Sequence, residues 1–422
     1  VDKKYRYLPL YSVSGLWRIS QEPFMANAKW IDNLVVRASY GLQGNIDKNT
    51  SPYLLGNYRI ENILPGGSED MIDVSGAPNK KLRWEKTHSV NAGFDFAVLN
   101  QAINLSVDYY YRKGVDLIGT QMLPLETGFE MLTVNWASMQ NQGVEIALST
   151  RNIHTKNFMW TTNFNFAYNN NKILKEALRE DALEPGREGY PVGALFALKT
   201  AGLDEEGYPM FEGKDGKAVS AMEFFKLQEW GFGATDLTAR ERRELYTYVG
   251  TADCPYTGGF NNTFTYKAFE LGVNFSFDFG GKVRSQPTYS IVDFDKGRNT
   301  NRDILNRWTP ENTETIFPVL LSQNERLDEY MWYSNQNEIY RNLDIWIRDL
   351  NYVRLQNIRL GYTLPTNFSR KLGMTSATIA IEGRNLLVFG SSYKNYLDPE
   401  TMSNAYATPA PKSVTLSLNL NF

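Results

Sequence analysis

Few groups in this chain are suited to catalysis. His88 and His154 are the only histidines, and neither belongs to an HExxH pattern, a nucleophile elbow or a phosphate-binding loop. Carboxylate pairs for glycoside hydrolysis are defined by a separation in space that sequence does not give. The single cysteine, Cys254, cannot form a disulfide within the chain. We therefore expect a protein that binds rather than an enzyme.

Polar side chains at every second position are better candidates for binding. Amides and charged groups so placed can hydrogen-bond the hydroxyl groups of a sugar or the peptide groups of a polypeptide. They can equally serve neighbouring strands, another part of the protein or water. The polar set is Asn104, Asp108, Arg112, Glu145, Asn163, Asn165, Asn274 and Asp278. From it we take Asp108, Glu145 and Asn163 as candidate substrate contacts.

Aromatic rings gather in two segments between the alternating ones. Tyr330, Trp332 and Tyr333 stand together in EYMWYSN, and Trp230 stands in a second segment rich in tyrosine. Flat rings beside amides can stack on sugars, and they can also form an interface with a partner protein. These four residues are further candidate substrate contacts.

Two acidic turns are the only candidates for a metal. The segments 204–207 (DEEG) and 214–216 (KDG) could hold Ca²⁺ weakly, but neither has the spacing of an EF-hand. Turn formation accounts for both compositions. We expect no dedicated metal site and no cofactor.

The polar candidates alternate with apolar residues, which is the pattern of strands with one oily face. The last ten residues, SVTLSLNLNF, alternate strictly and end on Phe422. The same pattern predicts about eleven strands of roughly 9 to 13 residues, paired largely as hairpins. The alternation that marks them is seen over 10–19, 34–43, 91–98, 103–112, 144–149, 160–169, 264–266, 271–279, 352–363, 377–389 and 413–422.

The lengths of the connections indicate the fold class. Short links such as 100–101, 151–157 and 267–268 alternate with long ones such as 170–258 and 282–350. Short turns on one side and long loops on the other are typical of an outer-membrane barrel, and no apolar run approaches the roughly 18 residues of a spanning helix. We predict an all-β, transmembrane, antiparallel β-barrel. A soluble all-β carbohydrate-binding protein and a passive porin are the alternatives.

A barrel of this kind assigns the two faces of every strand. The residues expected against lipid are Phe94, Phe96, Leu105, Val107, Phe164, Phe166, Val273, Phe275, Leu416 and Leu418, and those expected in the lumen are Asp95, Asp108, Glu145, Asn163 and Asp278. Amphipathic rings favour the headgroup level, so aromatic girdles are expected at both membrane interfaces. The rings expected there are Tyr109, Tyr111, Trp160, Tyr168, Phe277 and Phe279.

Parity and composition add to this prediction. The final strand should end on the short-turn side, so an odd number of strands puts the start of the chain on the long-loop side. Eleven is half of twenty-two, the size of the plugged transporter barrels.

The net charge of −3 and pI near 5.7 argue against nucleic-acid binding. Val1 is not an initiator methionine, so we expect a fragment or a cleaved product. In the loops, 238–241 has a capping-box pattern, and 219–230 is a second candidate helix.

Several motifs carry a family resemblance. The segment 344–365, DIWIRDLNYVRLQNIRLGYTLP, resembles the signature before the last strands of SusC/RagA-type TonB-dependent transporters. Further matches follow in family order, and together they cover almost the whole chain. They are VRASYGLQG near 35–44, LRWEKTHSVN at 82–91, NQGVE at 141–145, NNNKI at 169–173, RWTP at 307–310, EGRNL at 382–386 and the terminal Phe422.

The resemblance implies more than the residues alone do. It implies that 1–422 is the C-terminal half of a 22-stranded plugged barrel, with the plug and N-terminal strands absent from this chain. It implies import of oligomeric nutrients, usually glycans and in some relatives peptides, across the outer membrane of a Bacteroidota-type bacterium. The implied partners are a SusD-like lipoprotein lid, the N-terminal half with its plug, and the TonB complex. Phe422 is the implied assembly signal.

Overall fold

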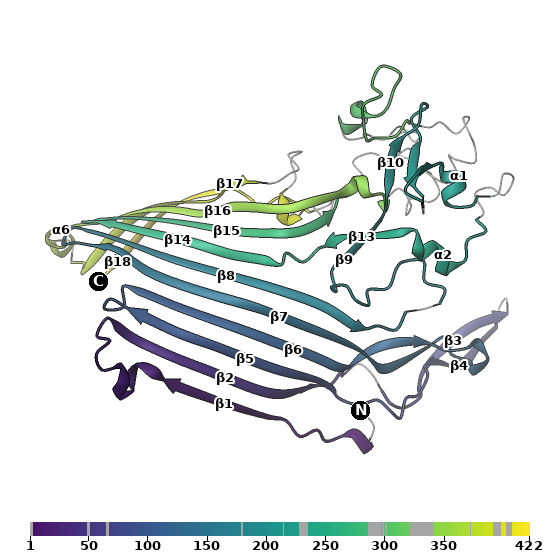
Figure 1. Cartoon of the computed structure of the whole chain (residues 1–422), viewed down its shortest axis with the longest axis horizontal. Coiled ribbons are helices and arrows are strands. Elements are labelled where there is room, and N and C mark those ends of the chain that lie inside the picture. Colours follow the sequence, from purple (N-terminus) through teal and green to yellow (C-terminus); the bar gives the residue numbers. More distant parts are fainter. Residues whose placement is uncertain are drawn as a thin grey trace.

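A computed structural model shows a chain made almost entirely of antiparallel strands (Figure 1). It describes residues 3–422 except 49–50, 65–66, 179, 214, 228–234, 286–296, 298, 300–301, 321–340, 372, 391–397 and 402–406. No helix in the described part is long and apolar enough to cross a membrane.

Eleven strands form one sheet in the order β1-β2-β5-β6-β7-β8-β14-β15-β16-β17-β18. Its strands are β1 (Tyr11–Arg18), β2 (Ile31–Asn45), β5 (Glu85–Val98), β6 (Ile103–Met122), β7 (Met131–His154), β8 (Phe158–Lys175), β14 (Tyr256–Tyr266), β15 (Phe269–Arg284), β16 (Ile347–Thr363), β17 (Ser376–Phe389) and β18 (Ser413–Asn421). Apart from long excursions outside the sheet, each strand pairs with the next in the chain. The eleven predicted strands are confirmed.

The observed strands are longer than the sequence pattern indicated. β7 has 24 residues and β6 has 20, against the roughly 13 expected. Alternation of apolar and polar residues marks only the part of a strand that has an apolar face. Pairing of β6 with β7 continues beyond that part, up to Met122 with Met131, where the side chains no longer alternate.

The two ends of the sheet differ as predicted. Short turns join strands at one end, including the turn around Asn100 and the one at Lys267, both with positive φ. The long excursions all leave from the other end (Figure 1). The amino-terminal part of the chain lies toward the long-excursion end and the carboxy terminus lies at the short-turn end, which confirms the predicted direction of β1.

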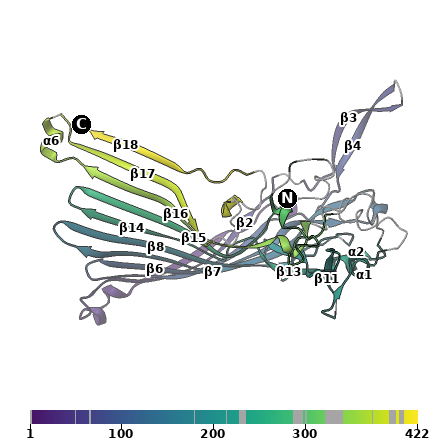
Figure 2. The same ribbon diagram turned by 90° about the horizontal axis from the view of Figure 1, so that it is seen from above.

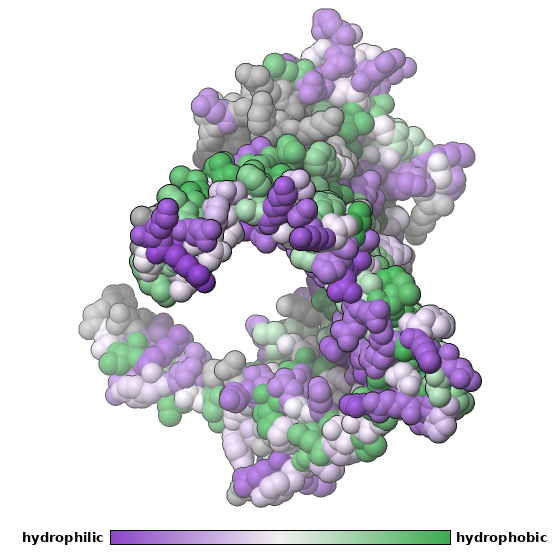
Figure 3. All heavy atoms as spheres, turned by 90° about the vertical axis from the view of Figure 1, so that its left-hand side faces the viewer, coloured by the Kyte–Doolittle hydropathy of each residue, from purple (hydrophilic) through white to green (hydrophobic). Residues whose placement is uncertain are grey.

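The sheet curves, and it is not closed among the described residues. Viewed along the strands, the wall bends around a hollow that is open on one side (Figure 3). β1 pairs only with β2, and β18 pairs only with β17, so each has one edge without a partner in the described part of the chain.

The long excursions carry small sheets of their own. A separate hairpin of β3 and β4 projects away from the wall (Figures 1 and 2). The other excursions form a three-stranded and a two-stranded sheet, which pack around a buried apolar cluster of Leu198, Phe211, Phe225, Leu343 and Trp346. The strands are β3 (Leu55–Leu64), β4 (Gly67–Gly76), β9 (Ala194–Leu198), β10 (Thr200–Leu203), β11 (Pro209–Glu212), β12 (Ala218–Val219) and β13 (Tyr246–Thr251).

Helices in the described part of the chain are short. The predicted capping box is confirmed: the Thr238 side chain accepts from the backbone N–H of Glu241, and the Glu241 side chain accepts from that of Thr238. Of the second candidate helix, only Ala221–Phe224 is helical, and residues 228–230 lie outside the described residues. The helices are α1 (Ala221–Phe224), α2 (Ala239–Glu244), α6 (Thr366–Lys371), η1 (Lys3–Tyr5), η2 (Ile19–Gln21), η3 (Pro23–Met25), η4 (Leu125–Thr127), η5 (Arg302–Asn306), η6 (Asp344–Trp346) and η7 (Pro399–Thr401).

The faces of the sheet separate as predicted. In register, Phe94 pairs with Val107, while Asp95 pairs with Ser106 on the other face. The apolar face stays open to the surroundings, with Leu416 77% exposed and Leu418 60% exposed. An exposed apolar surface of this extent has to be covered by lipid or by a partner protein. The polar face is the concave one, because it lines the two large hollows described below.

Candidate functional site

Register aligns polar side chains of the concave face into rows that run across the strands. Asn163 pairs with Asn261, Asn261 with Asn274, and Asn274 with Asn357. In the other direction Asn163 pairs with Ser149, and Ser149 pairs with Asn104. We call Asn104, Ser149, Asn163, Asn261, Asn274 and Asn357 the asparagine row. It crosses six adjacent strands, from β6 to β16, at one level of the wall.

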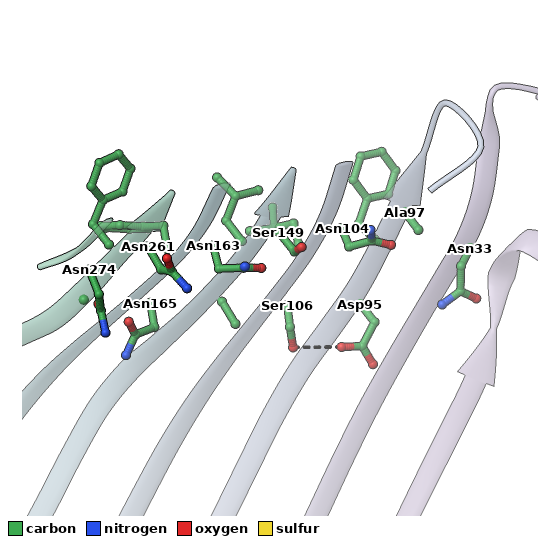
Figure 4. A pocket seen from close by; sticks show the side chains of 17 residues that line it. Asn33, Asp95, Ala97, Asn104, Ser106, Ser149, Asn163, Asn165, Asn261 and Asn274 are labelled. Carbon is green, nitrogen blue, oxygen red and sulfur yellow. Dashed lines mark hydrogen bonds between the residues drawn. The ribbon is translucent and has the colours of Figure 1, made fainter. Parts of the chain in front are cut away.

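Most amides of this row have free hydrogen-bonding capacity. Asn163, Asn261 and Asn274 make no side-chain hydrogen bond to another described residue, whereas Asn104 Nδ2 donates to the Gln101 carbonyl at 2.9 Å. They line a hollow of about 570 Å³ together with Asn33, Asn165, Ser106 and Asp95, whose carboxylate is ion-paired with Arg37 (Figure 4). Each free amide offers two donors and a carbonyl acceptor. The hollow can therefore bind an uncharged, hydroxyl- or amide-rich molecule.

Nearer the long loops, carboxylates join the concave face: Asp95 lies one same-face position from the asparagine row, and Asp108 and Glu145 lie two. Arg37 on β2 pairs with Asp95 on β5 and with Asp108 on β6, and it donates through Nε to Asp108 Oδ1 at 3.2 Å. Ser106 Oγ donates to Asp95 Oδ1 at 2.8 Å. One guanidinium thus serves two carboxylates.

A glycine makes this reach possible. Gly93 lies between Arg37 and Asp108 in the register. A Cβ built on Gly93 would stand 2.3 Å from Asp108 Oδ1. Adjacent strands lie about 4.8 Å apart, so Arg37 has to reach across roughly 10 Å of sheet to meet a carboxylate two strands away. A side chain on β5 would block that path.

A second hollow, of about 460 Å³, adjoins the first and is acidic. Asp108, Glu145 and Asp278 line it. Asp278 accepts a hydrogen bond from the Tyr352 hydroxyl at 2.5 Å. Glu145 has no ion-pair or hydrogen-bond partner among the described residues. At this level the wall therefore presents an unpaired negative charge.

The structure brings together three of the seven candidate contacts. Asp108 and Glu145 are direct cross-strand neighbours, and Asn163 lies two same-face positions away, in the adjoining hollow. Trp230, Tyr330, Trp332 and Tyr333 lie outside the described residues.

Sequence reasoning missed Arg37, Ser149 and Asn261. Arg37 and Ser149 lie on the concave face of predicted strands, so the parity of the alternation could have found them. Asn261 lies before the predicted range 264–266, and continuing its alternation towards the amino terminus places it on the same face. What the sequence lacked was the partner: Arg37 and Asp108 are 71 positions apart.

The glycine of the NQGVE segment also has a packing role. A Cβ on Gly143 would stand 2.6 Å from the Tyr110 hydroxyl oxygen. The Tyr110 ring therefore lies across this position, and its hydroxyl donates to Asn169 Oδ1 at 2.9 Å. The motif glycine lets a concave-face tyrosine lie against the wall.

Tryptophan and tyrosine rings lie at two levels on the apolar face of β8 and β14, and phenylalanines lie between them, with the predicted girdle residue Phe277 stacked on Phe164 at 6.3 Å. Near the short turns, Trp160 stacks on Phe264 with ring centroids 5.5 Å apart. Toward the long loops, Tyr168 stacks on Tyr256 at 5.1 Å. Tyr168 follows Trp160 by eight positions on β8, which places the levels about 26 Å apart along the strand. For strands tilted by roughly 40°, that distance corresponds to about 20 Å of membrane thickness, which is close to the apolar band of about 25 Å between two girdles.

The remaining candidates have structural partners or stay predictions. The carboxylate of Asp204 accepts the backbone N–H groups of Glu206 at 3.0 Å and Tyr208 at 2.8 Å, which is turn formation. His88 Nδ1 lies 2.9 Å from the Tyr40 hydroxyl on the apolar face. Phe422 is 83% exposed beyond the end of β18, and its role in assembly is untested.

Comparison with known proteins gives a consistent result. Residues 3–197 match the family described as "TonB dependent receptor-like, beta-barrel". TonB-dependent receptor P3 of Formosa agariphila is 27% identical over 453 residues, which cover 100% of this chain and 42% of that protein. TonB-dependent receptor SusC of Bacteroides thetaiotaomicron is 25% identical and matches 100% of this chain and 40% of that protein.

Solved structures agree with the fold. The RagAB peptide transporter superposes with a TM-score of 0.75 at 23% identity, covering 98% of this chain and 43% of the matched chain. The same importer in its "closed-closed" state gives a TM-score of 0.76 and covers 100% of this chain. The chain thus spans less than half the length of the relatives that it matches.

Proposed function

We propose, on the premise that this chain belongs to the TonB-dependent receptor β-barrels of the outer membrane, that it forms one half of a barrel wall through which oligomeric nutrients are imported. The family is of the SusC/RagA type. The other half of the barrel, its plug and the energy of the TonB complex would come from outside these 422 residues.

The two faces of the sheet support this proposal. The convex face carries an apolar band between two aromatic levels, as a lipid-facing surface requires. The concave face carries the asparagine row and the acidic hollow. A soluble carbohydrate-binding protein would have no use for the first feature.

For the cargo we propose a neutral oligosaccharide, and the asparagine row is the observation on which this rests. Asn163, Asn261 and Asn274 present uncharged amides with no side-chain partner among the described residues. A sugar hydroxyl group can donate to the amide oxygen or accept from the amide nitrogen. No charged side chain from these strands interrupts the row from Asn104 to Asn357.

Peptide cargo is the second candidate, because amides bind peptide groups equally well. The unpaired Glu145 separates the two possibilities. A passage with a free carboxylate disfavours acidic peptides, whereas it leaves a neutral glycan unaffected. In Glu145→Gln, we expect unchanged uptake of neutral oligosaccharides. A peptide importer would instead gain acidic peptides.

For partners we propose a SusD-like lipoprotein on the outer face and the TonB complex on the inner one. The long excursions provide ample protein surface on the side where a lid would dock, including the projecting β3–β4 hairpin. Co-purification of the full-length transporter with a surface lipoprotein tests the first of these.

The direct test of cargo binding uses the full-length transporter complex and panels of neutral oligosaccharides and peptides. Asn163→Leu with Asn261→Leu removes two free amides from the hollow. Each lost hydrogen bond is worth about 0.5–1.5 kcal/mol, so affinity should fall by roughly 5- to 150-fold. Asn27→Leu, in an exposed turn before β2 that lines neither hollow, is the control and should change nothing. Binding unaltered in the double variant would contradict the proposal.

A further inference from the structure

Arg354 is the arginine of the signature segment, and its surroundings are unusual. It is 1% exposed, on a face of the sheet where most charged groups are accessible. It lies on β16 opposite Ser276 of β15, which places it on the concave face. Burial of a guanidinium is costly unless its donors are met by hydrogen-bonding partners.

Those partners come from the loop between β17 and β18. Arg354 Nε donates to Glu400 Oε1 at 2.8 Å, and another guanidinium nitrogen pairs with Asp398. The Tyr352 hydroxyl lies 3.3 Å from Glu400 Oε1. Asp398, just before η7, and Glu400 within it thus each engage a different nitrogen of one guanidinium, and such charge-assisted hydrogen bonds are about twice as strong as neutral ones.

Asp398 also connects both arms of its loop. Its carboxylate accepts the backbone N–H of Glu400 at 3.1 Å and that of Ala410 at 3.3 Å. The Asp398 side chain is 7% exposed in the ion pair, and Pro399 is buried. The described parts of the loop, 398–401 and 407–412, are therefore tied to each other as well as to the wall.

We propose that Arg354 is a positioning residue that anchors the η7 turn against the concave wall, so that this turn, with Glu400, forms part of the lining of the passage. The role as passage lining rests on the proposed transport function, whereas the anchoring does not.

We expect the η7 turn to stay bound to Arg354 rather than to open and close. Release of the turn would leave a buried guanidinium with Asp398 and Glu400 both withdrawn, and Asp278 is already engaged by Tyr352. Lysine would not replace arginine, because a point ammonium cannot serve two carboxylates in the same fork geometry.

The test follows the accessibility of the buried turn in the full-length transporter. Pro399→Cys, in a Cys254→Ser background, is labelled on intact cells with a membrane-impermeant maleimide. The labelling rate should rise at least tenfold when Arg354→Met is added. Arg359→Met is the matched control: Arg359 lies on the same face of the same strand and pairs with Glu270 instead, so its loss should leave the rate unchanged.

A second variant covers the case in which Arg354→Met does not assemble. Asp398→Asn weakens the same contact from the loop side and should raise the labelling rate in the same direction. A rate equal to that of the parent in whichever variant assembles would overturn the anchor.

Cargo measurements on the same variants separate the two parts of the proposal. We expect Arg354→Met to change oligosaccharide affinity of the intact complex at least threefold, and Arg359→Met not to. Faster labelling with unchanged affinity would overturn the role of the turn as lining. If no variant, the parent included, bound or carried any cargo, the proposed function would fail while the anchor stood.

Discussion

Phe164 offers the sharpest test of the two faces. It lies on β8 midway between Trp160 and Tyr168, the residues that mark the aromatic levels. Phe164 therefore lies about 13 Å along the strand from either aromatic level, at the middle of the apolar band. An arginine at that depth on the lipid face costs about 2–4 kcal/mol.

The neighbouring residue supplies the control. Asn163 is next in the chain but lines the hollow of the concave face. Asn163→Arg should cost little, because water reaches it, and Trp160→Arg should cost only about 0–1 kcal/mol for the charge, because it lies at the interface level. Phe164→Ala separates the loss of the ring from the gain of charge.

The assay is reversible unfolding of the full-length transporter by urea in lipid vesicles, followed by heat-modifiable mobility. The expected order of destabilisation is Phe164→Arg, then Phe164→Ala, then Asn163→Arg. Equal costs for Phe164→Arg and Asn163→Arg would refute the assignment of the faces.

Three further predictions follow from single residues. Phe422→Ala should lower the amount of heat-modifiable barrel in the outer membrane without changing synthesis; normal surface levels would count against an assembly role. Gly143→Ala should destabilise the wall by about 1–3 kcal/mol through overpacking, whereas Gly272→Ala, which has no atom within 4 Å of a built Cβ, should not; equal unfolding midpoints would contradict this. Hydrogen bonds, first from the Thr238 backbone, lower the pKa of Glu241 to about 2, so the stability that its carboxylate gives α2 is complete above the ordinary value near 4.5 and lost as pH falls toward 2. Hydrogen exchange of the α2 amides should show that loss in the parent, and protection unchanged down to pH 2 would refute it.

The wall of the molecule was predictable because its signal is local. Strict alternation, as in β18, fixes both the strand and the direction of each side chain, and the short turn at Lys267 fixes the register of β14 with β15. Repetition of this signal along the chain made the barrel class recognisable before any contact was known.

The site was less predictable because it depends on pairs that are distant in sequence. The hollow joins Asn104 to Asn274, and the anchor joins Arg354 to Asp398, 44 positions away. Alternation says that such residues share a face, but only the register says which of them meet. The excursion strands, such as β9 with β13, were missed because they are stabilised by the apolar cluster around Phe211 rather than by a pattern of their own.

The central claim is that this chain is part of a closed barrel wall in a membrane. In hydrocarbon, each unsatisfied backbone group costs several kcal/mol, so this claim requires strands that pair with the edges of β1 and β18, which have no partner among the described residues. The most direct measurement is hydrogen exchange of the β1 and β18 amides, in the full-length transporter and in this 48.2 kDa chain purified alone in detergent. The account predicts protection equal to that of β7 in the full-length protein, and an aggregated or unprotected edge in the isolated chain. A monodisperse isolated chain with fully protected edge amides would contradict it.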